Sequence, residues 1–232
     1  MDETNRERTW ELLGLLFKAH PWHGVAAGPD APKVVTAYIE LVPSDTVKYE
    51  IDKATGILKV DRPQQFSNVC PALYGFIPRT FCGERVAAFS QAHTDLPTLE
   101  GDGDPMDICV LSEKAFSHGD FLLQAIPLGG LRLIDHGQAD DKIIAVLKGD
   151  AAYGQAQEIG DIPEALINRL KHYFLTYKRP PEAEHGAVEI ADVYGRAEAC
   201  EVIERSREDY RRKFPDLEGG LLDALAGNKR GN

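Results

Sequence analysis

The spacing of apolar residues changes along the chain, and this change constrains the fold more than any other feature. Residues 3–20 carry apolar side chains at helical spacing, and this pattern ends before Pro21. From Val34 to about residue 147 the apolar segments are short and rich in β-branched residues, which predicts strands. Helical spacing returns only near residue 161. One helix, many strands and two further helices predict an α+β fold around a small β-barrel.

The central region contains one clear hairpin. A strictly alternating segment at 47–52 places Lys48 and Glu50 on one face, and a turn leads from it to a partner strand at 57–61. Further strands are expected at 34–42, 106–111, 121–128 and 142–147.

The remaining segments are expected to be irregular or helical. Residues 90–101 predict a long irregular excursion. Asp161 is expected to cap a helix that has Pro163 in its first turn, and a last helix is expected at 196–213. The apolar stripe of the first of these helices consists of Ile167, Leu170, Phe174 and Tyr177.

Length and composition favour one ordinary core. A chain of 232 residues, 43% of them apolar, can bury a sizeable interior, so we expect a single domain over residues 1–232. Residues 1–33 would form an N-terminal helical extension and connector. Residues 34–178 would form the functional core, and residues 179–232 the C-terminal helix and tail.

The net charge and the cysteine pattern indicate which partners the chain can bind and in which cellular compartment it works. The net charge of −11 argues against binding to nucleic acid or to an anionic membrane. The polar N-terminus has no apolar signal region, and the apolar run at 121–131 is too short to span a bilayer. The four cysteines show no C-x-x-C spacing and are expected to be reduced thiols. We therefore expect a cytoplasmic protein.

The segment Asp102-Gly103-Asp104-Pro105-Met106-Asp107 is the most informative part of the sequence. Its three carboxylates repel one another unless a cation is near, and such hard oxygen ligands suit Mg²⁺ or Mn²⁺. A solvated acidic turn is an equally good interpretation of this segment alone. A calcium-binding EF-hand loop is excluded, because its sixth position holds Asp107 where glycine is required.

Three further charged groups have ordinary structural interpretations when taken singly. Asp135, Asp140 and Asp141 with Lys142 suit a charged hairpin; Lys48, Glu50 and Arg62 suit cross-strand pairing; and Tyr177-Lys178 suits a capped helix end. Together they supply carboxylates for metals, cations for phosphate oxygens and tyrosine hydroxyls. That combination suits metal-assisted transfer of a phosphoryl group to water.

The acidic segment resembles the signature of the family I soluble inorganic pyrophosphatases, in which Asp, a small or polar residue, Asp, Pro, an apolar residue and Asp follow one another. The similarity covers about residues 34–178. Other segments follow in the family's order: Ile39-Glu40, Lys48 to Asp52, Asp61-Arg62, Tyr74 to Ile77, Asp135, Asp140 with Lys142, and Tyr177-Lys178.

The resemblance implies a fold and a reaction. The fold would be a small closed OB-like β-barrel with flanking helices, with an extra N-terminal helix added in this chain. The reaction would be Mg²⁺-dependent hydrolysis of pyrophosphate to two orthophosphates, with Mn²⁺ or another divalent metal as a possible substitute. We also expect a homo-oligomer: the apolar face of the N-terminal helix, at Trp10, Leu13, Leu16 and Phe17, would suit a subunit contact, and packing onto the chain's own barrel is an equally good interpretation of it.

The resemblance also implies a role for each matching residue. Asp104 would be the general base, and Glu40 would match an acidic residue kept near the site. The metal ligands would be Asp102, Asp107, Asp135, Asp140 and Glu50. The residues that bind the substrate would be Lys48, Arg62, Tyr74, Lys142, Tyr177 and Lys178.

The chain departs from the family pattern at several positions. Cys70 replaces a tyrosine, and His136 replaces an acidic residue, where it would be either a ligand for a softer metal or a surface histidine. Residues 80–101 and 179–190 look inserted.

Three other functions stay open on the sequence alone. The first is a hydrolase of a nucleotide or polyphosphate, which the lack of an aromatic platform for a base disfavours. The second is an OB-like module for single-stranded nucleic acid, which the net charge disfavours. The third is a catalytically silent interaction protein, which only Cys70 and His136 support.

Overall fold

A computed structural model describes residues 18–178, except 66 and 97, together with residues 188–215, 217 and 219. Most of the predicted N-terminal helix, with Trp10, Leu13, Leu16 and Phe17, lies outside the described residues. Residues 18–20, its expected end, are not helical. Residues 179–187 of the second apparent insertion also lie outside them. None of the described helices has the length and apolar composition needed to cross a bilayer.

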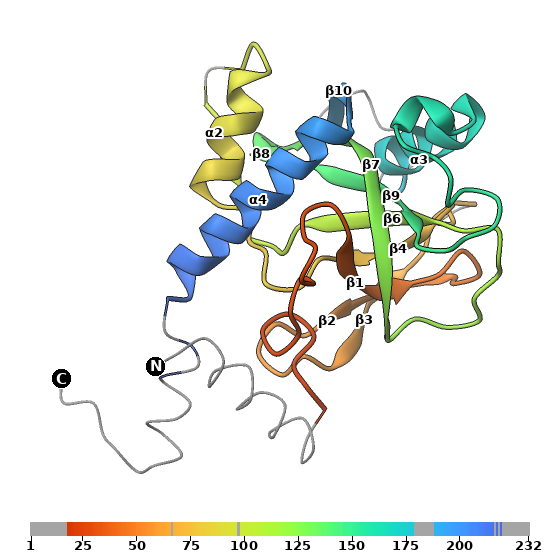
Figure 1. Cartoon of the computed structure of the whole chain (residues 1–232), viewed down its shortest axis with the longest axis horizontal. Helices are drawn as coiled ribbons and strands as arrows, with labels where there is room; N and C mark the ends of the chain where they lie inside the picture. The colour runs from red at the N-terminus through yellow and green to blue at the C-terminus, as the bar shows by residue number, and fades with distance from the viewer. Residues whose placement is uncertain are drawn as a thin grey trace.

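Five strands form the centre of the fold: β1 (Val35–Leu41), β4 (Leu73–Phe76), β6 (Asp107–Leu111), β9 (Lys142–Leu147) and β7 (Phe121–Asp135). Each is hydrogen-bonded to the next in that order, and β7 pairs back onto β1. The pairings are antiparallel except between β6 and β9. The pairings therefore return to their starting strand, which confirms the predicted barrel (Figure 1).

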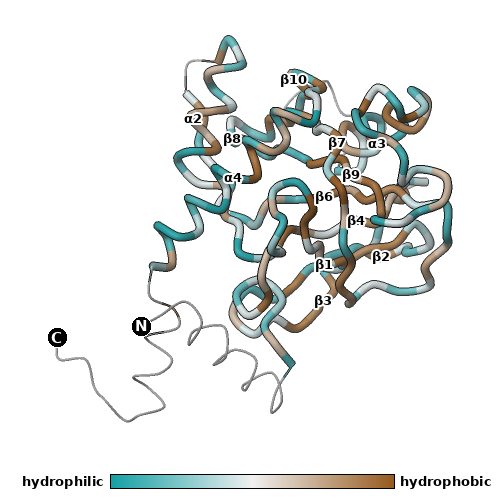
Figure 2. The backbone as a smooth tube through the Cα atoms, in the orientation of Figure 1, coloured by the Kyte–Doolittle hydropathy of each residue, from teal (hydrophilic) through white to brown (hydrophobic). Residues whose placement is uncertain are grey.

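The central strands have continuous runs of apolar residues because the side chains on both faces of these strands are buried. In β6, Ile108 and Val110 belong to a first apolar cluster of buried side chains, while Cys109 and Leu111 belong to a second apolar cluster. A strand covered on both faces has no solvent side that would select alternating polar residues. Figure 2 shows the corresponding hydrophobic stretches in the barrel strands.

Strand β7 is longer than the predicted segment 121–128, because two glycines continue it. The backbone shifts register against β9 between Pro127 and Gly129, and the strand then runs on to Asp135. A Cβ atom on Gly130 would lie 2.4 Å from the Tyr194 ring, so glycine is needed there for close packing. The glycine pair thus permits a close approach and does not end the strand.

Shorter strands flank the barrel. The predicted hairpin is confirmed as β2 (Val47–Ile51) and β3 (Leu58–Pro63), with a register shift between Lys48 and Tyr49. Strands β5 (Glu100–Gly101), β8 (Gln138–Ala139) and β10 (Val188–Gly195) extend the main sheet through β7 and β8.

Helices cover the barrel, and one of them was not predicted. Helix α2 (Glu84–Ala92) lies within the apparent insertion 80–101 and packs beside α4 (Arg196–Lys213) (Figure 1). Because α2 extends to residue 92, the prediction of an irregular segment over 90–101 is partly wrong. The predicted last helix is confirmed as α4. Helix α3 (Glu164–Thr176) buries the predicted stripe from Ile167 to Tyr177 in the second apolar cluster.

The expected cap of α3 is wrong. Asp161 ends a short 3₁₀ helix, η1 (Ile159–Asp161), and its carboxylate accepts the N–H groups of Gln157 and Glu158 at 2.8 and 3.0 Å. The N-cap position of α3 is held by Pro163 instead. The Asp161 carboxylate therefore accepts backbone N–H groups of the preceding turn, and it makes no capping hydrogen bond to α3.

Candidate active site

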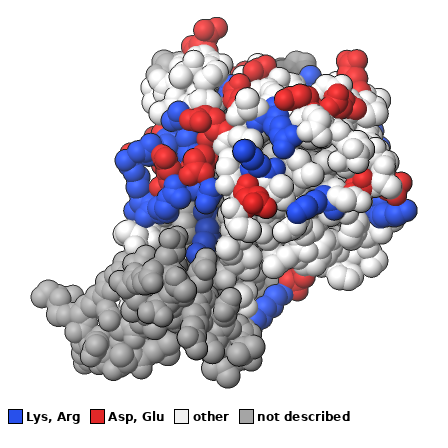
Figure 3. Space-filling view, in the orientation of Figure 1, with Lys and Arg blue, Asp and Glu red and all other residues white. Residues whose placement is uncertain are grey.

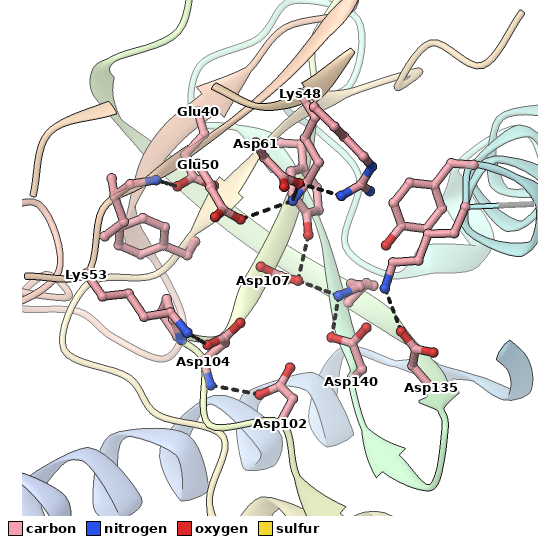
Figure 4. A pocket seen from close by; sticks show the side chains of 18 of the residues that line it. Glu40, Lys48, Glu50, Lys53, Asp61, Asp102, Asp104, Asp107, Asp135 and Asp140 are labelled. Atoms are coloured by element: carbon pink, nitrogen blue, oxygen red, sulfur yellow. Dashed lines mark hydrogen bonds and ion pairs between the residues drawn. The ribbon is translucent and has the colours of Figure 1, made fainter. Parts of the chain in front are cut away.

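All thirteen candidate residues line a single cavity of about 340 Å³. They come from strands and loops far apart in the sequence, and Figure 4 shows their side chains converging from several sides. The cavity lining contains eight carboxylate and five cationic side chains. Such a surplus of carboxylates beside cationic groups can hold both divalent cations and an anion.

The loop before β6 presents the acidic segment to the cavity. The Asp104 N–H donates to the Asp102 carboxylate at 2.9 Å, which closes a tight local turn. Gly103 lies in the left-handed region at φ +76° and has open space around it. Asp107 begins β6, and its carboxylate accepts the Tyr74 hydroxyl at 2.6 Å.

Two of the acids form a buried pair. Burial and the neighbouring Asp140 raise the pKa of Asp102 to about 9, and the two side chains share a hydrogen bond. The pKa of Asp140 is also raised, chiefly by burial. Two carboxylates this close share one proton unless a nearby cation allows both to ionise.

Lys142 provides the opposite charge at the floor of the cavity. Its ammonium group bonds to both Asp107 and Asp140, and the residue is only 2% exposed. Burial opposes its charge, but Asp107 and Asp140 outweigh that effect and hold the pKa of Lys142 well above its ordinary value. The lysine therefore stays charged over the physiological range.

The hairpin supplies a second cluster of charges. Lys48 donates to Asp61 at 3.1 Å and lies 3.5 Å from Glu50, while Arg62 pairs with Asp61. Burial opposes the charge on Lys48, but Asp61 raises its pKa above the ordinary value. The alternation of β2 thus places Lys48 and Glu50 together as predicted.

Glu40 belongs to β1, interacts with the charges of Lys48 and Glu50 in this cluster, and is 6% exposed. One carboxylate oxygen accepts the Ile51 N–H at 2.7 Å. Burial raises the pKa of Glu40 to about 8, and the charge of Asp107 adds to this effect. Burial therefore favours the protonated form of Glu40.

The far side of the cavity is formed by the end of α3. Lys178 donates to Asp135 at 2.6 Å, and the Arg62 guanidinium lies over the Tyr177 ring, 5.4 Å from its centroid. Burial opposes the charge on Lys178, while Tyr177 and Asp135 raise its pKa. Tyr177 is thus held between cations that face the cavity.

The two departures from the family pattern lie outside the cavity. Cys70 is fully buried in the second apolar cluster, and burial raises the pKa of its thiol to about 12. His136 is in the two-residue turn after β7 at φ 52°, with a side chain that is 73% exposed. Its Nδ1 lies 2.6 Å from the carboxylate of its neighbour Asp135. This exposure favours the surface-histidine interpretation.

Asp141 belongs to a separate network. Its side chain accepts the Tyr194 hydroxyl at 3.0 Å and lies 4.0 Å from Arg132, which is fully buried. Burial raises the pKa of Asp141 to about 7. Its two neighbours in the chain, Asp140 and Lys142, line the cavity, whereas Asp141 does not.

Three polar residues of the cavity lining, Lys53, Asp61 and Gln138, have no role assigned from the sequence. Asp61 directly precedes Arg62, a candidate for phosphate binding, so the sequence alone could have predicted that Asp61 lies near the site. Lys53 lies in a turn and Gln138 follows the β7–β8 turn. Neither position carries a pattern that predicts a site.

The donor set of the cavity fits divalent cations. Among the described residues, no three His, Cys, Asp or Glu side chains meet around a single point, because lysine ammonium groups lie between the carboxylates. The buried Asp102–Asp140 pair nevertheless requires positive charge when both are ionised. Carboxylate oxygens are also the ligands that Mg²⁺ and Mn²⁺ prefer.

Comparisons with known proteins agree with this chemistry. The sequence profile of the family described as "Inorganic pyrophosphatase" matches residues 37–211. An inorganic pyrophosphatase of Chlamydia caviae is 52% identical over 199 residues, which cover 84% of this chain and 92% of that protein. One of Chlamydia muridarum is 50% identical over 84% of this chain and 95% of its own length.

A solved structure shares the fold as well. The inorganic pyrophosphatase from Thermus thermophilus superposes with a TM-score of 0.69 at 30% identity, covering 83% of this chain and 99% of that one. With a profile match across most of the chain and relatives at half identity, this chain belongs to the inorganic pyrophosphatase family.

Proposed function

We propose that this chain hydrolyses inorganic pyrophosphate to two orthophosphates, and that the cavity described above is its active site. One observation carries the proposal: a single cavity is lined by eight carboxylate and five cationic side chains, and all thirteen candidate residues, including Tyr74 and Tyr177, are part of its lining. A phosphoanhydride substrate needs both sets, because divalent cations and Lys or Arg together neutralise the charge that develops on the phosphoryl oxygens.

The carboxylates would hold the metals. Asp102, Asp107 and Asp140 would form one site, while Asp135 and Glu50 would help to hold further cations. A bound divalent cation supplies a water of lowered pKa. The family is metal-dependent, and we propose Mg²⁺ as the metal, with Mn²⁺ as a substitute.

The cationic side chains would bind the substrate. Lys48, Arg62, Lys142 and Lys178 are held at the cavity wall by the acids that they pair with, so their positions are set before the anion arrives. Tyr177 would donate from the same side as Lys178. The Tyr74 hydroxyl is already used on Asp107, so Tyr74 would orient that ligand.

Asp104 would be the general base. Its side chain is 45% exposed, so it can reach a water molecule, whereas the side chain of Asp107 is only 20% exposed. The proton of the attacking water would pass to its carboxylate. No covalent intermediate is needed, since water attacks phosphorus directly.

Substrate preference tests the proposal. Phosphate release is measured with Mg²⁺ at equal concentrations of pyrophosphate, tripolyphosphate and ATP. We expect pyrophosphate to be hydrolysed much faster than the other two. Hydrolysis of ATP or tripolyphosphate at the same rate would contradict the assigned substrate.

Three finer expectations belong to the same proposal. We expect a cytoplasmic protein, self-association in solution, and no binding to nucleic acid. The face shown in Figure 3 has acidic and basic side chains interspersed, which does not favour a polyanion there. Sedimentation of the full chain tests self-association, and a single-stranded oligonucleotide titration tests the absence of nucleic-acid binding.

A further inference from the structure

The turn between β2 and β3 brings a lysine without an assigned role to the cavity. Lys53 lies in this turn, lines the cavity and pairs with Asp104, the proposed general base (Figure 4). Its side chain is 55% exposed, so the ammonium group has room to move. The cation at the mouth of the cavity is therefore bonded to the one carboxylate that must be free to accept a proton.

The backbone of this turn is fixed by its own residues. The Asp52 carboxylate accepts the Thr55 N–H at 3.0 Å and the Thr55 hydroxyl at 2.9 Å. The Gly56 N–H donates to the Asp52 carbonyl at 2.7 Å, with Gly56 in the left-handed region at φ +71°. The Lys53 side chain thus projects from a rigid base.

A segment before the barrel supports the turn from outside. His20 Nε2 lies 3.2 Å from the Lys53 carbonyl oxygen, while its Nδ1 accepts the N–H groups of Trp22 and His23 at 3.2 and 3.4 Å. A neutral ring with Nε2–H as the donor satisfies all three contacts. His20 therefore joins residues 18–24, which precede the family match at 37–211, to the backbone of Lys53.

The packing at Gly56 shows how closely the two segments fit. A Cβ atom there would lie 2.8 Å from Cδ of Pro21 and 2.9 Å from the His20 ring. A side chain at position 56 would therefore clash with residues 20–21, so glycine is needed for the turn to pack against them.

We propose that Lys53 is a substrate-binding residue that leaves Asp104 for a phosphoryl oxygen of pyrophosphate, and that His20 is its positioning residue. This inference rests on the proposed function. Pyrophosphate carries more negative charge than a carboxylate, so its oxygens compete well for the ammonium group. Arrival of the substrate then frees Asp104 to accept the proton from water.

Steady-state kinetics of four variants test the inference in Mg²⁺. Losing one charge-assisted hydrogen bond at a half-exposed site predicts a KM for pyrophosphate that rises about tenfold in Lys53→Ala. His20→Ala is expected to raise KM by a smaller factor and to add nothing when combined with Lys53→Ala. Lys114→Ala is the matched control, since Lys114 is also an exposed lysine paired with an acid, Glu113, at 2.9 Å.

Binding of the non-hydrolysable analogue imidodiphosphate, measured by calorimetry, separates the inference from the proposed function. Weaker binding by Lys53→Ala than by wild type supports the role of Lys53 even if the wild type releases no phosphate. If wild type and Lys53→Ala have the same affinity for imidodiphosphate and the same KM for pyrophosphate, the substrate-binding role of Lys53 is overturned. Additive effects of the His20 and Lys53 substitutions would overturn the positioning role of His20, and both variants must keep the wild-type circular dichroism spectrum.

Discussion

Replacing Glu40 by glutamine should change how the stability of the protein depends on pH. Glu40 is 6% exposed, and burial raises its pKa to about 8 from 4.5. Above pH 4.5 the unfolded chain has lost this proton while the folded protein keeps it. The group therefore destabilises the folded state progressively as pH rises from 4.5 to 8, and its effect is constant above that.

The size of this effect follows from the two pKa values. Each pH unit between them changes the free energy of unfolding by about 1.4 kcal/mol. Allowing for partial titration at both ends, Glu40 should lower the stability by about 3 kcal/mol more at about pH 8 than at about pH 5. The substituted glutamine would keep an oxygen for the Ile51 N–H but has no proton to lose.

Urea denaturation of wild type and Glu40→Gln at about pH 5 and about pH 8, in the presence of a chelator, measures this difference. We expect the variant to gain about 3 kcal/mol relative to wild type between these two pH values. The other buried acids titrate in both proteins, so the comparison isolates Glu40. A stability difference that does not change with pH would refute the claim that Glu40 is buried as a neutral acid.

Three further substitutions test the site and its support. Asp104→Asn should keep the fold and lower kcat by roughly 10²- to 10⁴-fold, the usual effect of losing a general base, and near-normal turnover would remove Asp104 from that role. Asp107→Ala should abolish metal-dependent activity and weaken Mg²⁺ binding in calorimetry; unchanged affinity would show that Asp107 is not a ligand. Asp209→Ala should lower the free energy of unfolding by about 1–2 kcal/mol in urea denaturation, because Asp209 accepts the N–H groups of Gly83, Arg85 and Val86 at the start of α2. A loss close to zero would mean that α2 does not depend on this cap.

Local patterns predicted the elements whose signals lie within their own residues. The alternation of β2, the β-branched runs of β1 and β9, and the stripe of α3 are each set by which faces they bury. Helix α2 could not be found in this way, because its cap is Asp209, more than a hundred residues away, and its first flanking residue is Gly83. Strand β10 was missed because its structure comes from pairing with β7.

The sequence predicted those parts of the site whose residues lie together in short motifs. The acidic segment and the Lys48–Glu50 pair indicate metal and phosphate binding from residue type and spacing alone. The resemblance to a family supplied the remaining candidates, and the structure places all of them in one cavity. Lys53 and His20 were not predicted, because their connection depends on a backbone contact between two loops.

Metal-dependent hydrolysis of pyrophosphate in the carboxylate-lined cavity is the central claim about this protein. The most direct measurement is phosphate release from pyrophosphate by wild type and by Asp107→Ala, with Mg²⁺ and with excess chelator. We predict two phosphates per pyrophosphate for wild type, loss of release with chelator, recovery on adding Mg²⁺, and no release by the variant. Release that is insensitive to chelator, or that persists in Asp107→Ala, would contradict it.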